Sequence, residues 1–330
     1  MSKGNEKASG PPARKSAHPP SQAETHRMAS VCDAVIKKAR HLAKECRISH
    51  GAGFRLKDHD PAETMGFESE DHPLAREALE SGVEILSQLQ DKLYAQDKWA
   101  VLLIFQGMDA AGKDGVVKHV MSGVNPAGCQ VYSFKEPSAE DLDHDFLWRC
   151  IKCLPNRGHI GIFNRSYYEE VLVVRVHPHL LAAEKVPSSL VTKNIWTERF
   201  EDICNMERYL YRNGIVTAKF FLNLSRDEQK RRFLERVDNP DKNWKFSIAD
   251  VTEREYWDDY HKAFEEMIRN TATRESPWYV IPADNKWFAR IVVSAAVIHT
   301  LDRLDLSYPK VDKEKFAEIK KARAALLNSR

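Results

Sequence analysis

The 330-residue sequence has no apolar run that approaches the roughly 20 residues needed to cross a membrane. It also lacks the apolar core of a signal peptide near its first residue. Fifty Lys and Arg residues nearly balance 48 Asp and Glu residues, so the formal net charge is only +2. Without a strong global field we expect no attraction to nucleic acid or to a membrane, and any polyanion must be bound by a local cluster of cations. These absences predict a cytoplasmic protein.

Cysteine is scarce, with six residues in the chain. Only Cys150 and Cys153 have a spacing seen in metal or redox sites, and no second Cys or His pair accompanies them at the distance that a zinc site needs. Both lie in an apolar helical pattern. We therefore expect buried free thiols rather than metal or redox chemistry.

Composition divides the chain into four parts. Residues 1–30 are rich in Pro, Ser, Ala, Gly and Lys and predict a disordered tail. Residues 31–97 predict a helical extension, whose second half has leucines and a valine at spacings of three and four. Residues 98–305 predict the core, with a lid at about 226–250, and residues 306–330 predict a C-terminal helix.

Short apolar strands alternate with helical patterns through the core. Strands are predicted at 100–105, 130–134, 159–163, 216–222 and 278–281, and helices at 113–121, 139–153, 192–213, 248–268 and 287–304. Consecutive βα units predict an α/β fold, a three-layer sandwich in which helices cover both faces of a five-stranded parallel sheet. Ligands bind at the carboxyl ends of the strands in such sheets, so polar residues there are the site candidates.

The segment at 107–114, GMDAAGKD, follows the first strand of the predicted core and precedes a predicted helix. Gly107, Gly112 and Lys113 have the G-x4-G-K spacing of a phosphate-binding loop, in which the backbone, here including Ala110 and Ala111, closes around phosphate oxygens. Lys113 adds a point charge, and the N-terminus of the following helix adds its dipole. The segment therefore predicts a phosphate site.

Two acids set this segment apart from the usual pattern. Asp114 stands where a Ser or Thr hydroxyl normally reaches a magnesium ion, and Asp109 lies within the loop. Two carboxylates beside a phosphate would repel it unless a divalent cation lies between them. Asp109 and Asp114 therefore predict a Mg²⁺ site.

A second polar segment follows the third predicted strand. Asn164 and Arg165 should face the same crevice as Lys113, with Arg165 placed to hold a terminal phosphate in a bidentate manner. An ion pair between Arg165 and Glu169 is the alternative. Asn164, Tyr168 and Glu169 are also candidates for contacting a nucleotide.

Beyond this segment lie Arg175 and His177. We expect Arg175 to bind phosphate and His177 to be structural or to steer phosphate. A general base at His177 is the alternative, but phosphoryl transfer depends more on positioning and charge than on proton abstraction.

The predicted helix after the fourth strand is strongly basic, with Lys230, Arg231, Arg232 and Arg236. At 100° per residue, Arg232 and Arg236 share the face opposite Phe233, Leu234 and Val237. An anion that spans the two arginines would relieve their repulsion. The following loop adds Lys242 and Lys245, which are further candidates for nucleotide contact. A basic helix before such a loop favours a lid that closes over phosphates, and a solvated charged face is the alternative.

Together these motifs closely resemble those of family-2 polyphosphate kinases. The matching stretches are GMDAAGKD at 107–114, FNRSYYEEVLVVRVH at 163–177, EQKRRFLER at 228–236, DNPDKNWKFS at 238–247 and PWYVIPADNKWFAR at 277–290. The resemblance extends over roughly residues 50–305, and several separate motifs agree, which is far more specific than one phosphate loop.

The resemblance implies a thymidylate-kinase-like P-loop core with a helical lid. It implies phosphoryl transfer between inorganic polyphosphate and nucleotides with Mg²⁺ or Mn²⁺, and an assembly into homodimers or homotetramers. By motif, Asp109 and Lys113 match the catalytic acid and lysine of the family, and Arg165 matches its phosphate-binding arginine. Many members have Asp where this chain has Asn164. The sequence of residues 167–177 is more similar to that of the single-domain branch, which acts on both AMP and ADP, than to that of the ADP-only branch.

The chemistry of such a substrate agrees with the residues. A linear polyanion needs a row of cations, and the chain offers Lys113, Lys118, Arg165, Arg175 and the basic helix. An ATP-dependent nucleotide or small-molecule kinase on the same fold is the main alternative. A non-catalytic, nucleotide-gated binding module is the other, with Asn164 as a sign of lost catalysis.

Overall fold

The computed structural model describes residues 36–70 and 73–329, apart from the side chains of Leu74 and Lys245. The tail predicted at 1–30 lies outside the described residues. The strands are β1 (Arg47–Ile48), β2 (Ala100–Gln106), β3 (Cys129–Ser133), β4 (Ile160–Asn164), β5 (Ile215–Asn223) and β6 (Trp278–Pro282). A helix at 36–46 is followed by α2 (Pro73–Gln96), α3 (Lys113–Val120), α4 (Trp148–Ile151), α5 (Val173–Val176), α6 (Ile195–Arg212), α7 (Arg226–Asp238), α8 (Ile248–Thr252), α9 (Trp257–Thr271), α10 (Lys286–Asp302) and α11 (Lys313–Asn328).

The sheet has the order β1-β6-β5-β2-β4-β3, and β2 to β6 are all parallel. The five strands predicted for the core are confirmed to within one residue at each end. The prediction of a five-stranded sheet is wrong by one strand, because β1 pairs antiparallel with β6 and places Arg47 opposite Tyr279. A strand of two residues is too short to show the alternation that identifies strands in a sequence.

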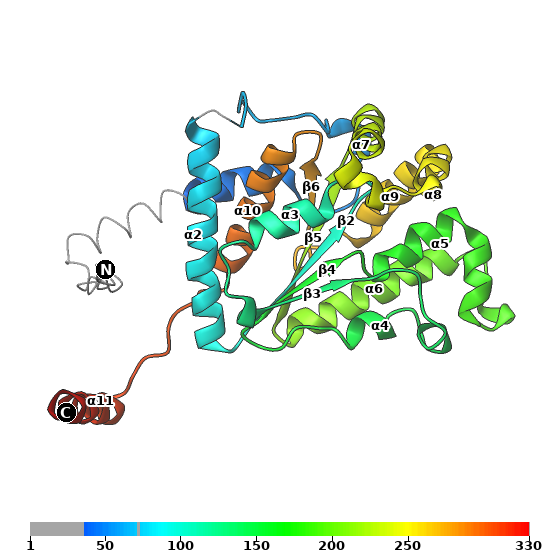
Figure 1. Ribbon diagram of the computed structural model, residues 1–330. Helices are drawn as coiled ribbons and strands as arrows, with labels where there is room; N and C mark the ends of the chain where they lie inside the picture. The colour runs from blue at the N-terminus through cyan, green and yellow to red at the C-terminus, as the bar shows by residue number, and fades with distance from the viewer. Residues whose placement is uncertain (1–35, 71–72, 330) are drawn as a thin grey trace, which may run out of the picture.

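Helices cover both faces of the sheet, as predicted, and form three layers (Figure 1). On one face, α2, α3, α10 and the helix at 36–46 pack on apolar residues of β2 and β5 such as Leu103 and Phe220. On the other face, α6 and α9 pack on Leu102, Ile104 and Phe221. Alternate residues of a strand point to opposite faces, so a strand buried on both faces is apolar throughout.

Two predicted helices are interrupted. The helix predicted at 139–153 is wrong, because a 3-10 turn at Asp141–Asp143 and the short α4 occupy the segment. Ser138 and Asp141 exchange the two hydrogen bonds of a capping box, at 3.0 and 3.2 Å, but the turn that they cap ends at once. The helix predicted at 248–268 is also broken, into α8, a 3-10 turn at Glu253–Tyr256, and α9.

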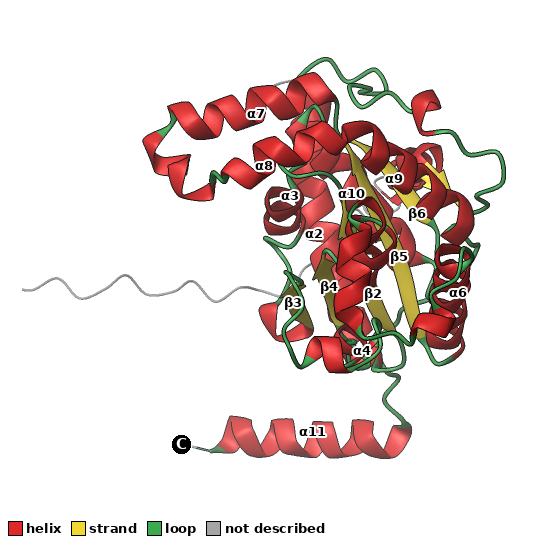
Figure 2. Ribbon diagram, turned by 90° about the vertical axis from the view of Figure 1, so that its right-hand side faces the viewer, coloured by secondary structure: helices red, strands yellow, loops and turns green. Residues whose placement is uncertain are grey.

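Two parts project from the layered core. Figure 2 shows α7 and α8 reaching out together beyond the sheet, and α11 lying apart from the other elements. All side chains of α11 are exposed. No helix in the described ranges is long and apolar enough to cross a membrane.

A charged pair lies beneath the sheet, between β5 and α6. Lys219 is wholly buried, and its Nζ donates to Glu207 Oε2 at 2.6 Å, to Tyr168 Oη at 3.0 Å and to the Thr271 carbonyl at 2.8 Å. Glu207 Oε1 accepts from the hydroxyls of Tyr167 and Tyr168 at 2.9 and 2.8 Å. Burial lowers the pKa of Lys219, and the Glu207 carboxylate opposes that shift. The network fixes the segment after β4 to the core.

Breaking this pair should destabilise the fold strongly. The variant Lys219→Met leaves the Glu207 charge buried and uncompensated, so we expect the free energy of unfolding to fall by about 3–5 kcal/mol. The double variant Lys219→Met/Glu207→Gln removes both charges and should lose less. Urea unfolding of both proteins measures the difference, and an equal loss in the two would contradict a dominant charge effect.

Candidate active site

The glycine-rich loop at 107–113 joins β2 to α3 in a backbone conformation that depends on its glycines. Gly107 and Gly112 have φ of +155° and +98°, a region that residues with a side chain rarely adopt. A Cβ on Gly107 would also lie 3.0 Å from the Leu222 carbonyl oxygen. Ala110 adopts φ of +65° without being glycine, which indicates local strain of the kind that functional loops store.

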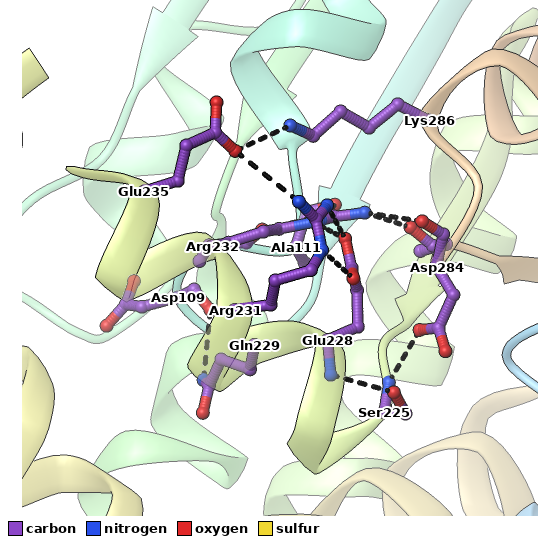
Figure 3. A network of polar contacts seen from close by, with 12 residues as sticks. Asp109, Ala111, Ser225, Glu228, Gln229, Arg231, Arg232, Glu235, Asp284 and Lys286 are labelled. Carbon is purple, nitrogen blue, oxygen red and sulfur yellow. Dashed lines mark hydrogen bonds and ion pairs between the residues drawn. The ribbon is translucent and has the colours of Figure 1, made fainter. Parts of the chain in front are cut away.

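Every backbone carbonyl from residue 107 to residue 111 accepts a hydrogen bond from a side chain. Lys113 Nζ donates to the carbonyls of Gly107 and Met108 at 2.7 and 3.2 Å. Gln229 of α7 donates to that of Asp109 at 3.0 Å, and Arg232 donates to those of Ala110 and Ala111 at 2.9 and 3.0 Å (Figure 3). The negative ends of these peptide dipoles are therefore occupied by donors, two of which are cationic.

Arg232 is a buried brace of the loop. Its guanidinium, 4% exposed, also donates to the carbonyls of Ala283 and Asp284 at 2.5 and 3.0 Å, and to Glu228 at 2.7 Å. Figure 3 shows it between Ala111 and Asp284, joining the loop to the segment that enters α10.

The predicted faces of α7 are wrong. Arg232 and Phe233 are both buried, whereas Leu234 and Val237 are 51% and 48% exposed. At position 232 a buried arginine is favoured because it donates hydrogen bonds to backbone carbonyls of other segments. Hydrophobic periodicity does not reveal such hydrogen bonds.

Charged groups meet where the loop approaches the end of β4. Arg165 Nη2 donates to Asp109 Oδ1 at 2.6 Å, and its Nη1 lies 3.6 Å from Glu169 Oε2. Arg165 also has a φ of +62°, a strained backbone conformation that sets the direction of its side chain. Arg165 thus forms the ion pair with Glu169, which was the alternative, and at the same time donates to Asp109 of the loop.

Burial and the neighbouring charges together shift the pKa values of this group. It raises the pKa of Glu169, although Arg165 and Lys113 oppose the shift. It lowers the pKa of Lys113, and the Arg165 guanidinium adds to that effect. The Glu169 carboxylate in turn raises the pKa of Arg165. A bound anion would offset the desolvation of both cations.

A cavity of about 590 Å³ opens over the loop, at the carboxyl ends of the strands. We refer to it as the cation-lined cavity. Seven Lys or Arg residues line it, namely Lys113, Lys135, Arg165, Arg232, Arg236, Lys242 and Lys286. Asp109, Asp114, Glu136 and Glu235 are its acidic residues. The excess of cations fits a polyanionic ligand.

A second hollow of about 310 Å³ adjoins it and shares Phe134, Lys135, Glu136 and Arg165 with it. We refer to it as the apolar hollow. Its other walls include the apolar side chains of Leu142, Phe146, Val173, Val174, Leu180 and Ala183. Apolar walls beside a shared arginine suit a ligand with a flat apolar part and a charged end.

The residues present fit a divalent metal that arrives with phosphate. Asp109 and Asp114 both line the cation-lined cavity, and Asn164 donates a hydrogen bond to Asp114. The described residues contain no group of three His, Cys, Asp or Glu side chains placed to hold an ion by themselves. Mg²⁺ in phosphate sites is held by one or two carboxylates together with waters and substrate phosphates, so two acids suffice.

A family model described as "Polyphosphate kinase 2 (PPK2)" matches residues 69–309 of this chain. The chain belongs to the polyphosphate kinase 2 family. It is 51% identical over 285 residues to the ADP-polyphosphate phosphotransferase of Rhodopseudomonas palustris, covering 86% of this chain and 98% of that protein. It is 42% identical over 267 residues to the AMP/ADP-polyphosphate phosphotransferase of Meiothermus ruber, covering 81% and 96%.

Solved structures agree with this membership. The crystal structure of polyphosphate kinase 2 from Arthrobacter aurescens matches with a TM-score of 0.77 at 37% identity, covering 87% of this chain and 97% of that chain. The family resemblance of the motifs is therefore confirmed. So is an α/β fold with a mostly parallel sheet.

The structure brings together most, but not all, of the site residues expected from the sequence. Asp109, Ala110, Gly112, Lys113, Asp114, Asn164, Arg165, Arg232, Arg236 and Lys242 line the cation-lined cavity of this PPK2 protein. Glu169 lines the apolar hollow instead. Lys118, Lys230 and Arg231 are exposed and lie outside both cavities. The side chain of Lys245 lies outside the described residues.

Three further residues are directed elsewhere. Tyr168 is fully buried and donates to Glu207, so it braces the core. Arg175 pairs with Glu266 of α9. His177 Nε2 lies 3.0 Å from Glu253 Oε2.

Sequence reasoning missed Lys135 and Lys286, which both line the cation-lined cavity. Lys135 follows β3 by two residues, and Lys286 begins α10 shortly after β6. The rule that ligands bind at the carboxyl ends of parallel strands would have identified both.

Arg231 and Arg232 provide a matched comparison on one helix. Arg232→Gln should lower the free energy of unfolding by about 1–3 kcal/mol, because buried carbonyls lose their donors, and should also reduce phosphoryl transfer. Arg231→Gln removes an exposed arginine that pairs with Glu228 and should change both quantities little. Urea unfolding and initial rates check this, and equal effects of the two substitutions would refute the brace.

Proposed function

We propose that this PPK2 protein transfers a phosphoryl group in line between the end of an inorganic polyphosphate chain and a nucleoside mono- or diphosphate, with Mg²⁺ or Mn²⁺. Two relatives, 51% and 42% identical to the chain, are named for phosphoryl transfer between polyphosphate and ADP or AMP/ADP. The observation that carries the detailed proposal is the cation-lined cavity, with seven Lys or Arg side chains over a loop whose carbonyls are covered.

Polyphosphate is the ligand that uses this cavity most fully. Its cations come from six places along the chain: the loop, the segments after β3 and β4, α7, the 3-10 helix at Pro240–Lys245 and the start of α10. A single terminal phosphate would need only Lys113 and Arg165, whereas a linear polyanion is long enough to contact Lys135, Arg236 and Lys286 as well. The row of cations therefore favours polyphosphate over a short anion.

The nucleotide fits the apolar hollow. A base contacts apolar walls such as Phe146 and Val173, while its phosphates extend toward the shared Arg165. The transferred group then passes beside Arg165 and Lys113, which neutralise charge on it. Relatives are named for ADP alone and for AMP and ADP together, and we propose both as acceptors here.

The chain's own residues position the reaction. Lys113 is held against the loop carbonyls, and Arg165 is held at Asp109, so neither cation must search for its place when phosphate arrives. Asp109 and Asp114 are the residues that would hold the metal, which when bound neutralises charge on the phosphates. Asn164 keeps the Asp114 carboxylate in place by its hydrogen bond.

In this proposal the core is a thymidylate-kinase-like P-loop domain, and the lid begins beyond Arg232. Gln229 and Arg232 tie the first half of α7 to the loop, whereas the described side chains of Arg236, the 3-10 helix at Pro240–Lys245 and α8 form no hydrogen bond with it. The part that closes over the substrate is then roughly residues 236–252. We also propose a homodimer or homotetramer in the cytoplasm, and light scattering of the purified protein tests the assembly.

The decisive assay supplies polyphosphate as the only phosphoryl donor. ADP should become ATP, and AMP should become ADP, when Mg²⁺ is present. An ATP-dependent kinase would show neither product without ATP, and a binding module would bind nucleotide without turnover from any donor.

Two substitutions in the loop test its role in this assay. Lys113→Ala and Asp109→Asn should each lower the rate by at least about 10²–10³-fold, since each removes a preorganised charge at the transferred group. Both proteins should keep the circular dichroism spectrum of the wild type. Lys118→Ala removes an exposed lysine of the same helix and is the control, with near-normal activity. Near-normal activity in either loop variant would exclude the assignment.

Substitutions of Lys135 and Lys286, the two cations that were not identified from the sequence, test where the polyphosphate chain binds. Lys135→Gln and Lys286→Gln should each raise the KM for polyphosphate by about twofold to fivefold with little change in kcat, as expected when one half-exposed ion pair is lost. Added salt should narrow the difference from wild type. A loss confined to kcat would contradict a binding role.

A further inference from the structure

A cavity of about 360 Å³ lies at the amino ends of the strands, at the opposite edge of the sheet from the glycine-rich loop. We refer to it as the rear cavity. Val216 and Thr217, in the first residues of β5, line it together with Trp99 and Pro277, which directly precede β2 and β6. Because β6 begins opposite Lys219, the first residues of β5 extend past it and leave room there. The nine-residue β5 separates this cavity from the active site by roughly 30 Å.

Two arginines without acidic partners line the rear cavity, and a third contacts the backbone of one of them. Arg274 and Arg303 line it, and Arg47 of β1 donates to the Arg274 carbonyl at 3.0 Å. Within the described part of the chain, none of the three guanidinium groups forms an ion pair. Burial, followed by Arg303 and Arg47, lowers the pKa of nearby His299 to about 4, so this region already disfavours a further positive charge. Uncompensated guanidinium groups that converge in this way favour an anion.

A buried hydroxyl also lies in the wall of the rear cavity. Thr217 is 1% exposed and lines the cavity, and its Oγ1 has no hydrogen-bond partner among the described residues. Nε of Arg47 is likewise buried and unpartnered. Buried polar groups are nearly always hydrogen-bonded in folded proteins, so the Thr217 hydroxyl in the wall of this cavity indicates a polar contact with a ligand.

The remaining walls are aromatic and apolar. Trp99, Tyr211 and Tyr279 line the cavity together with Leu304. Aromatic faces bind flat rings, and they contribute nothing to the binding of an inorganic anion. Glu275, the acidic residue of the lining, would also oppose a long polyanion.

We propose that the rear cavity is a second nucleotide-binding site, distinct from the catalytic one. The phosphates of the nucleotide pair with Arg274 and Arg303, the base packs against Trp99 and Tyr211, and the Thr217 hydroxyl hydrogen-bonds a polar atom of the ligand. Antiparallel pairing of β1 with β6 brings Arg47 to the Arg274 carbonyl, which gives the two-residue strand a role in holding the Arg274 segment.

Calorimetric titration with ADP, in the presence of Mg²⁺ and without polyphosphate, tests the proposal. The wild-type protein should bind two ADP molecules per chain. The variant Arg274→Gln/Arg303→Gln should bind one, with kcat and KM of phosphoryl transfer unchanged, because neither residue belongs to the active site. Thr217→Val, which keeps the shape of the side chain, should weaken the second site by about threefold to tenfold. The control Lys321→Gln/Arg323→Gln removes two exposed cations of α11 and should still bind two.

One ADP per chain in the wild type, or two in the Arg274→Gln/Arg303→Gln variant, would overturn the proposal. Inorganic tripolyphosphate that displaces ADP from the second site with equal affinity would overturn recognition of the nucleoside part. Polyphosphate-dependent formation of ATP is measured separately in the same proteins. A failure of the rear site therefore remains distinguishable from a failure of the proposed catalytic function.

Discussion

The active site depends on how the glycine-rich loop presents its backbone. A phosphate near a row of carbonyl oxygens is repelled unless those oxygens are already engaged by donors. In this chain all five carbonyls from 107 to 111 accept from Lys113, Gln229 or Arg232. Because Arg232 also holds the carbonyls of Ala283 and Asp284, the same guanidinium fixes the loop, α7 and the entrance to α10 relative to one another. The shape of the cation-lined cavity follows from that single junction.

Arg165 depends on a second anchor, at the end of β4. Its backbone is left-handed, and such a conformation persists only where the neighbouring residues are firmly held. Tyr167 and Tyr168, immediately downstream, are fully buried and bonded to Glu207, which is itself bonded to Lys219. A buried ion pair of this kind contributes less to net stability than its contacts suggest, because both charges are desolvated. Its structural consequence is local: it fixes the segment that directs Arg165 toward the loop.

The sequence predicts the parts of this protein that depend on local pattern. Strands buried on both faces are uniform apolar runs, which is why β2 to β6 were predicted to within one residue, and the loop and the Arg165 segment follow from their place after such runs. β1 could not be predicted from the sequence, because its two residues are defined by pairing with β6, which is far away in the chain. The burial of Arg232 could not be predicted for the same reason, since the carbonyls that accept hydrogen bonds from it belong to two distant segments. Lys135 and Lys286 were within reach of the rule on strand ends.

The cations of the proposed lid and of the start of α10 differ from Lys113 of the loop in having acidic partners. Arg236 lies 3.4 Å from Asp250, and Glu235 pairs with Lys242 and lies 3.8 Å from Lys286. These acids limit the mutual repulsion of the cations, but each must be displaced before the cation it holds can meet a phosphate. A short anion gains too few contacts to displace several acids, whereas a long chain that is already held at Lys113 and Arg165 meets each further cation at a high effective concentration. In the proposed function, pairing of these cations with acids therefore disfavours single phosphates and favours the polymer, which is a selectivity that a row of unpaired cations would not provide.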